Sequence, residues 1–126
     1  MIQARSSQRV FKTAWFSKAA RKALIPDHEL CSAIREVMLG QADDLGGGVF
    51  KKRLGKNRYR SIILARTRRF WVYEYLFAKQ NLANIDDDDL WRLRNLAKAY
   101  GGLTEHEVDE LIRVGNWVEI CDGIEA

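Results

Sequence analysis

The sequence predicts an α+β domain in which helices pack on one face of a mostly antiparallel sheet. Three strand-like segments follow one another between residues 49 and 78, and helix-like segments stand before and after them. The length of 126 residues suits one compact domain and is too short for two. We therefore take residues 1–126 as a single domain with a core at about residues 9–100, followed by an extra C-terminal helix and an acidic tail at residues 101–126.

The N-terminal third is expected to form one strand and two helices. Residues 9–16 alternate loosely and include β-branched and aromatic side chains, which favour a strand. Ser17 is placed to cap a short helix over residues 18–24, which ends before Pro26. A second helix is expected over residues 27–39, where apolar side chains recur with helical spacing.

The middle of the chain is a predicted β-meander. Its strand candidates are residues 49–54, 59–65 and 70–78, and their short connections favour antiparallel pairing. Residues 90–100 then carry apolar side chains at helical spacing, and a capping-box pattern at residues 104–107 begins a last helix. With all the helices on one face, the other face of the sheet would be free for function.

Strand alternation divides the side chains of the meander between two faces. Arg60 shares a face of its strand with Ile62. In the last strand, strict alternation places Tyr73 and Tyr75 together on one face, and Glu74 on the other. Because Glu74 is the only acid between residues 49 and 85, we expect it to form a salt bridge.

Positive charge is concentrated in two segments of a chain whose formal net charge is only +4. Residues 50–71 hold nine lysine or arginine residues and no acid, and residues 1–24 hold six and no acid. Basic residues on sheet edges often do no more than prevent aggregation, so this explanation has to be compared with a binding site. Since like charges on neighbouring strands repel, a polyanion partner explains the meander better than a solvated edge does.

Other kinds of site are disfavoured. Cys31 and Cys121 have no metal-type or redox-type spacing, so we expect two reduced, buried thiols. His28 and His106 stand beside acids at helix starts and are expected on the surface. The aspartates at residues 86–89 suit helix capping, so neither a metal nor a cofactor is expected. With no signal peptide or membrane-spanning stretch visible, a cytoplasmic protein without a membrane partner is the expectation.

Three phrases follow one another along the chain: GGGVFKKRLGKNRYRSIILAR, FWVYEYLFAKQNLANI and DDDDLWRLRNLAKAY. Their content and order resemble the RelE/HigB branch of the RelE/ParE toxin superfamily. The resemblance covers about residues 9–100 and includes a Lys-x-Arg phrase at residues 51–53, a Gly-Lys turn before Tyr59, and a Phe-Ala-Lys phrase that ends at Lys79.

The resemblance implies a toxin of a type II toxin-antitoxin system that cleaves messenger RNA, commonly in the ribosomal A site, and a cognate antitoxin that neutralises it. Toxins of this kind cleave without a metal and use Lys, Arg and Tyr side chains. The resemblance implies that Arg60 stabilises charge in the transition state and that Lys79 is the general acid or base. Tyr75 or Tyr73 could stack on a base or orient the 2′-hydroxyl, and packing in the core explains either tyrosine equally well. The expected RNA-binding residues are Lys51, Arg53, Lys56, Arg58 and Tyr73.

Two other functions remain open. A ParE-like inhibitor of DNA gyrase would share the fold and lack nuclease chemistry, and the combination of Arg60 with Lys79 argues against it. A non-catalytic module would bind RNA or DNA in a salt-sensitive manner and would release no cleavage product.

Overall fold

The computed structural model describes residues 7–67, 69–81 and 85–125. Within them the chain forms six strands and four helices, which confirms the α+β class. In chain order these are β1 (Ser7–Thr13), α1 (Ala14–Lys22), α2 (Asp27–Met38), β2 (Asp43–Asp44), β3 (Val49–Leu54), β4 (Tyr59–Leu64), β5 (Phe70–Ala78), α3 (Asp87–Gly101), α4 (Glu105–Arg113) and β6 (Trp117–Glu125).

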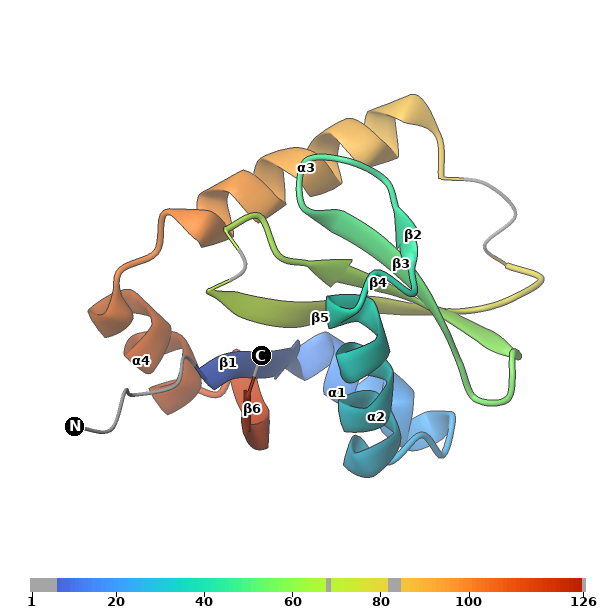
Figure 1. Cartoon of the computed structure of the whole chain (residues 1–126), viewed down its shortest axis with the longest axis horizontal. Helices are drawn as coiled ribbons and strands as arrows, with labels where there is room; N and C mark the ends of the chain where they lie inside the picture. The colour runs from blue at the N-terminus through green and yellow to red at the C-terminus, as the bar shows by residue number, and fades with distance from the viewer. Residues whose placement is uncertain (1–6, 68, 82–84, 126) are drawn as a thin grey trace.

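The strands form one mixed sheet in the order β2-β3-β4-β5-β1-β6 (Figure 1). The predicted antiparallel meander is confirmed, since β3 pairs with β4 and β4 with β5 in that sense. The first strand, β1, runs parallel to β5, and β6 pairs antiparallel with the other side of β1. The first and last strands are therefore neighbours, while the meander forms the opposite half of the sheet.

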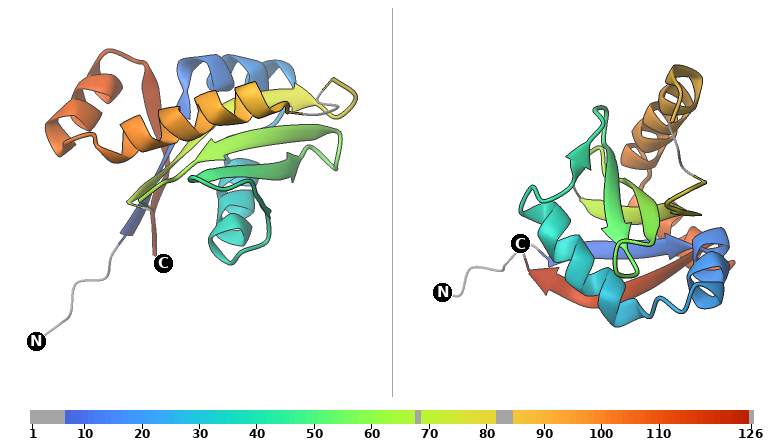
Figure 2. Two further views of the ribbon diagram at one scale, coloured as in Figure 1. Left: turned by 90° about the horizontal axis from the view of Figure 1, so that it is seen from above. Right: turned by 90° about the vertical axis from the view of Figure 1, so that its right-hand side faces the viewer.

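The helices cover both faces of the sheet, so the expectation of helices on one face is wrong. Ile63 packs with Leu30 of α2 in one core, whereas Ile62 and Leu64 pack with Leu93 of α3 in another. Figure 2 shows α2 and α3 on opposite sides of the β3–β5 strands. The physical reason is the composition of β4, which ends in an uninterrupted run of buried apolar residues. A strand that is apolar on both sides needs cover on both sides.

The first strand ends three residues earlier than predicted. Thr13 occupies the N-cap of α1, and its side-chain oxygen accepts a hydrogen bond from the backbone N–H of Phe16 at 3.0 Å. The cap is therefore Thr13 and not Ser17, and Trp15 belongs to the first turn of the helix. The predicted strand over residues 9–16 is correct only as far as Thr13.

The C-terminal segment contains an edge strand that its local pattern did not predict. Trp117 of β6 lies opposite Thr13, and Ile120 lies opposite Val10. Both Trp117 and Ile120 are buried, although they join different cores. The acidic tail is therefore anchored to the sheet.

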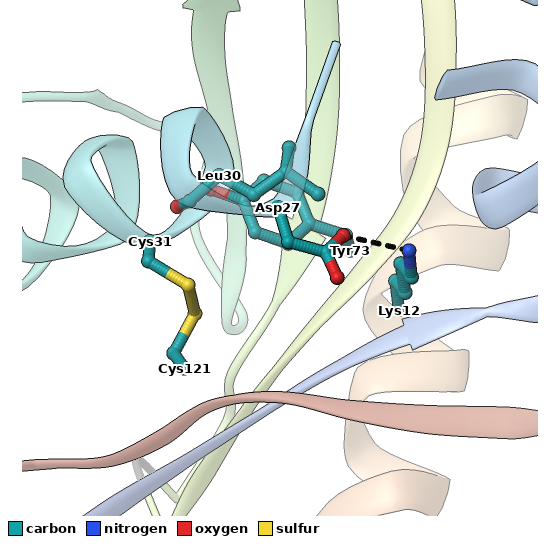
Figure 3. Close-up of a disulfide and its surroundings, with 6 residues drawn as sticks. All are labelled: Lys12, Asp27, Leu30, Cys31, Tyr73 and Cys121. Carbon is teal, nitrogen blue, oxygen red and sulfur yellow. Dashed lines mark hydrogen bonds and ion pairs between the residues drawn. A yellow bond between two sulfur atoms is a disulfide. The ribbon is translucent and has the colours of Figure 1, made fainter. Parts of the chain in front are cut away.

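A disulfide joins Cys31 of α2 to Cys121 of β6 (Figure 3). The expectation of two reduced thiols is wrong, because the two cysteines are brought together across a sequence separation of 90 residues. The reason is topological: α2 packs against β6, although no feature near either cysteine indicates this contact.

Candidate functional site

Basic side chains gather on the α3 face of the meander, near the turn that joins β3 to β4. Two rows cross the three strands: Lys51–Ile62–Tyr75 and Arg53–Arg60–Phe77. Directly opposed residues of antiparallel strands point to the same side of the sheet. Lys51, Arg53 and Arg60 therefore share the face on which Ile62 packs against α3. The predicted grouping of Arg60 with Ile62 is confirmed.

Arg60 is half-buried and held by its own turn. Its Nη1 donates to the carbonyl oxygens of Asn57, at 3.2 Å, and of Tyr59, at 3.0 Å. Its other guanidinium nitrogens make no hydrogen bond within the described ranges. The side chain is thus oriented from one end and keeps donors available for an anion.

The turn before β4 brings further cations beside Arg60. Lys56 and Asn57 have left-handed backbone conformations, with φ values of 55° and 70°. The backbone N–H of Lys79 donates to the carbonyl oxygen of Arg58 at 2.8 Å, so the β4–β5 ladder extends one pair beyond Ala78. Alternation from Phe77 then places Lys79 on the same face as the Arg60 row.

Ion pairing separates these cations from most others on the sheet. Lys52 is half-buried on the opposite face, where its Nζ lies 2.9 Å from a carboxylate oxygen of Glu36. The Nζ of Lys51 lies 3.7 Å from a carboxylate oxygen of the exposed Asp43. Five further cations form no ion pair with any carboxylate in the part of the chain that the structure describes: Arg53, Lys56, Arg58, Arg60 and Lys79. A surface with this property can accept an external anion.

Tyr73 and Tyr75 lie on opposite faces of the sheet. In the β4–β5 register they stand opposite consecutive residues of β4, so Glu74 is an extra residue that forms a β-bulge. Tyr73 is completely buried beneath α2, and its hydroxyl donates to the carbonyl oxygen of Leu30 at 2.7 Å. Burial also raises the pKa of Tyr73. The predicted contact between Tyr73 and RNA is therefore wrong.

Tyr75 is half-buried on the face that carries Arg60. Its ring lies 5.4 Å from that of Trp15 in an edge-to-face arrangement and 5.9 Å from that of Phe77. It lines a cleft of about 470 Å³ between the sheet and α3, together with Asp89 and Arg92. Burial, and then the nearby Glu74, raise the pKa of Tyr75. At neutral pH its hydroxyl is consequently a hydrogen-bond donor and not a phenolate base.

The bulge turns Glu74 towards α3, where its carboxylate accepts a hydrogen bond from the Tyr100 hydroxyl at 2.7 Å. Only 8% of Glu74 is exposed. Burial raises the pKa of Glu74, and the hydrogen bond from Tyr100 partly opposes this effect. No ion pair with Glu74 occurs among the described residues, so the expectation of a salt bridge is wrong.

A model of the family described as the RelE toxin of the RelE/RelB toxin-antitoxin system matches residues 8–120. The chain belongs to the RelE toxin family. The expectation of a toxin from the RelE/ParE superfamily is thereby confirmed, and toxins of this family pair with an antitoxin. A search of curated proteins finds no match.

The described residues of the RelE toxin show few features of a metal site, a histidine-based site or a membrane-spanning segment. Asp86 caps α3 by accepting from the N–H of Asp89 at 2.7 Å, which confirms the capping role of the aspartates. His28 and His106 are exposed, as expected. Across residues 7–67, 69–81 and 85–125 there is no group of three or more His, Cys, Asp or Glu residues that could hold a metal ion. Over the same ranges, no helix is both long and apolar enough to cross a membrane.

Trp15 was not among the predicted site residues, although its ring packs against that of Tyr75. It was missed because residues 9–16 were expected to form a strand. The pattern that would have identified it is the Thr13 cap followed by buried residues at Phe16 and Ala20, which leaves Trp15 on the exposed side of a helix.

Proposed function

We propose that this RelE toxin is an endoribonuclease that cleaves messenger RNA on the ribosome and thereby stops translation. The observation that carries the proposal is the set of unpaired cations around Arg60, beside the half-buried Tyr75. The sequence resemblance to the HigB branch supports ribosome dependence. The activity would be exercised in the cytoplasm and restrained by a cognate antitoxin.

Metal-free cleavage of RNA requires three operations at one phosphate. A base removes the proton of the ribose 2′-hydroxyl, the oxygen attacks the phosphorus, and an acid protonates the departing 5′-oxygen. We assign charge stabilisation of the pentavalent intermediate to Arg60, whose guanidinium is oriented by two backbone carbonyls. Lys79 is assigned one of the two proton transfers. Tyr75, as a protonated phenol, would donate a hydrogen bond or stack on a base.

The flanking phosphates are assigned to the remaining cations of the surface. Arg53 stands directly opposite Arg60, and Lys56 and Arg58 are exposed in the adjoining turn. Lys51 is 3.7 Å from Asp43, but an exposed ion pair is worth only about 0–1 kcal/mol. An RNA phosphate can therefore displace Asp43 at little cost.

The decisive experiment is cell-free translation followed by primer extension on the messenger RNA. Wild-type protein should stop translation and create new RNA ends, and Arg60→Ala or Lys79→Ala should reduce cleavage about 10²–10³-fold. Arg35→Ala is the matched control, because Arg35 is an exposed arginine of α2, on the other side of the sheet. It should cleave like the wild type.

Three other results would each contradict the proposal. Arrest of translation without new RNA ends would indicate a non-catalytic binding module. Inhibition of gyrase, with DNA synthesis falling before protein synthesis, would indicate the ParE-like function. Full cleavage by both Arg60→Ala and Lys79→Ala would contradict the assignment of these residues.

A further inference from the structure

The basic N-terminal segment is not used by the site on the sheet. Residues 1–24 hold six basic residues and no acid, and part of this charge is on α1. Phe16 faces the core from this helix. Trp15, Lys18 and Lys22 follow one another at spacings of three and four residues, which places them along one stripe of its surface.

This stripe borders a cleft of about 480 Å³ between α1 and the ends of β4 and β5. Tyr59 and Leu76 line the cleft from the sheet, and Ala19 lines it from the helix. Lys18 and Lys22 are exposed and form no ion pair with a carboxylate in the described ranges. The cleft thus combines aromatic and apolar walls with a rim of unpaired charge.

Trp15 connects this cleft with the candidate site. Trp15 is 51% exposed, and its ring contacts those of Tyr75 and Phe77 at centroid distances of 5.4 and 6.4 Å. The strand β1 does not separate the cleft from the candidate site, because β1 pairs with β5 only as far as Tyr73. From Tyr75 onward, β5 pairs with β4 alone among the described strands. The other edge of β5 has no partner strand there and lies beside Trp15.

We propose that the cleft between α1 and the ends of β4 and β5 is a second subsite for single-stranded RNA. Trp15 stacks on an unpaired base, and Lys18 and Lys22 bind the phosphates on either side of it. The proposal rests on the proposed function, because it continues the path of the RNA from Arg60 around the free edge of β5. Aromatic rings interleaved with unpaired lysines suit a strand of nucleotides, in which flat bases alternate with charge.

The test is fluorescence anisotropy with a labelled 2′-O-methyl RNA of about 12 nucleotides, a length that a strand-binding groove can cover and that resists cleavage. Trp15→Ala should weaken binding about 5–150-fold, which corresponds to the usual 1–3 kcal/mol of base stacking. Trp15→Phe should retain most of the affinity. The double variant Lys18→Ala/Lys22→Ala should lower the salt dependence of binding, on a log–log plot, by about 1.4.

Arg21→Ala is the matched control, since Arg21 is an exposed cation of α1 that does not line this cleft. It should leave affinity and salt dependence close to wild type. Circular dichroism establishes that each variant is folded, and the lysine double variant and Trp15→Phe carry the test even where Trp15→Ala does not fold.

Wild-type affinity in both Trp15→Ala and the lysine double variant would overturn the proposal. So would unchanged RNA binding together with lost capture of the antitoxin, because the surface would then serve a protein partner. Failure of the wild-type protein to bind this RNA at low salt would also overturn it. None of these results tests the proposed function, which the cleavage experiment with Arg60→Ala decides separately.

Discussion

Removal of the bridge between Cys31 and Cys121 should lower the free energy of unfolding by several kcal/mol. A disulfide stabilises a protein chiefly by restricting its unfolded chain, and the effect grows with the length of the closed loop. For a sequence separation of 90 residues, the chain-entropy relation predicts about 4–5 kcal/mol. This value is an upper figure, because native disulfides more often contribute about 2–4 kcal/mol.

The measurement is urea unfolding followed by tryptophan fluorescence, with and without dithiothreitol. For a urea m-value of about 1–3 kcal/mol/M, reduction should lower the midpoint by roughly 1–4 M. The double variant Cys31→Ser/Cys121→Ser should unfold like the reduced wild type, and dithiothreitol should not affect it. RNA cleavage should be unchanged on reduction, because the bridge joins α2 to β6 and the candidate site lies at the ends of β3–β5.

Two results would refute this reasoning. Alkylation of unreduced, denatured protein at both cysteines would mean that the bridge does not form. Equal midpoints for oxidised and reduced protein would mean that the loop-entropy argument does not apply to this chain.

Three more substitutions test the fold around the site. Tyr73→Phe should lose about 1 kcal/mol of stability through the hydrogen bond to α2, with RNA cleavage retained; urea unfolding and primer extension check both. Glu74→Gln should remove a pH dependence of stability. Because the pKa of Glu74 is raised on folding, the stability of the wild type falls as pH rises through the range above the ordinary pKa. The variant should lack this fall in a pH series of unfolding experiments. Gly48→Ala should cost at least about 2 kcal/mol, since φ is +85° and a Cβ would lie 2.5 Å from the backbone of Arg66. Gly40→Ala is its control, with a φ of +86° and open space around it, and an equal loss of stability in the two would refute the steric argument.

Features set by neighbouring residues were predictable from the sequence. The capping box of Thr104 and Glu107 begins α4, and Asp86 caps α3. The turns of the meander, and the grouping of Arg60 with Ile62 on one face of the sheet, follow from short connections and alternation. These signals are local, so no knowledge of the rest of the fold is required.

Features set by distant contacts were not predictable in the same way. The bulge at Glu74 separates Tyr73 from Tyr75, yet it appears only in the register between β4 and β5. The strand β6 exists because β1 is available as its neighbour, and the disulfide exists because α2 packs against β6. One additional residue in a strand is enough to move a predicted RNA-binding side chain such as Tyr73 into the core.

The two consecutive lysines of β3 show why the number of charges does not define the site. Alternation sends Lys52 towards α2, where Glu36 and the carbonyl oxygen of Gln41 satisfy its ammonium group, and only 14% of its side chain is exposed. Lys51 and Arg53 point to the other face and stand in the rows that include Tyr75 and Arg60. Lys52 therefore has close structural partners within the chain, whereas on the other face Lys51 has only the exposed Asp43 at 3.7 Å and Arg53 forms no ion pair among the described residues. The burial and close pairing of Lys52, which Lys51 and Arg53 lack, and not the sign of its charge, separate it from the residues available to RNA.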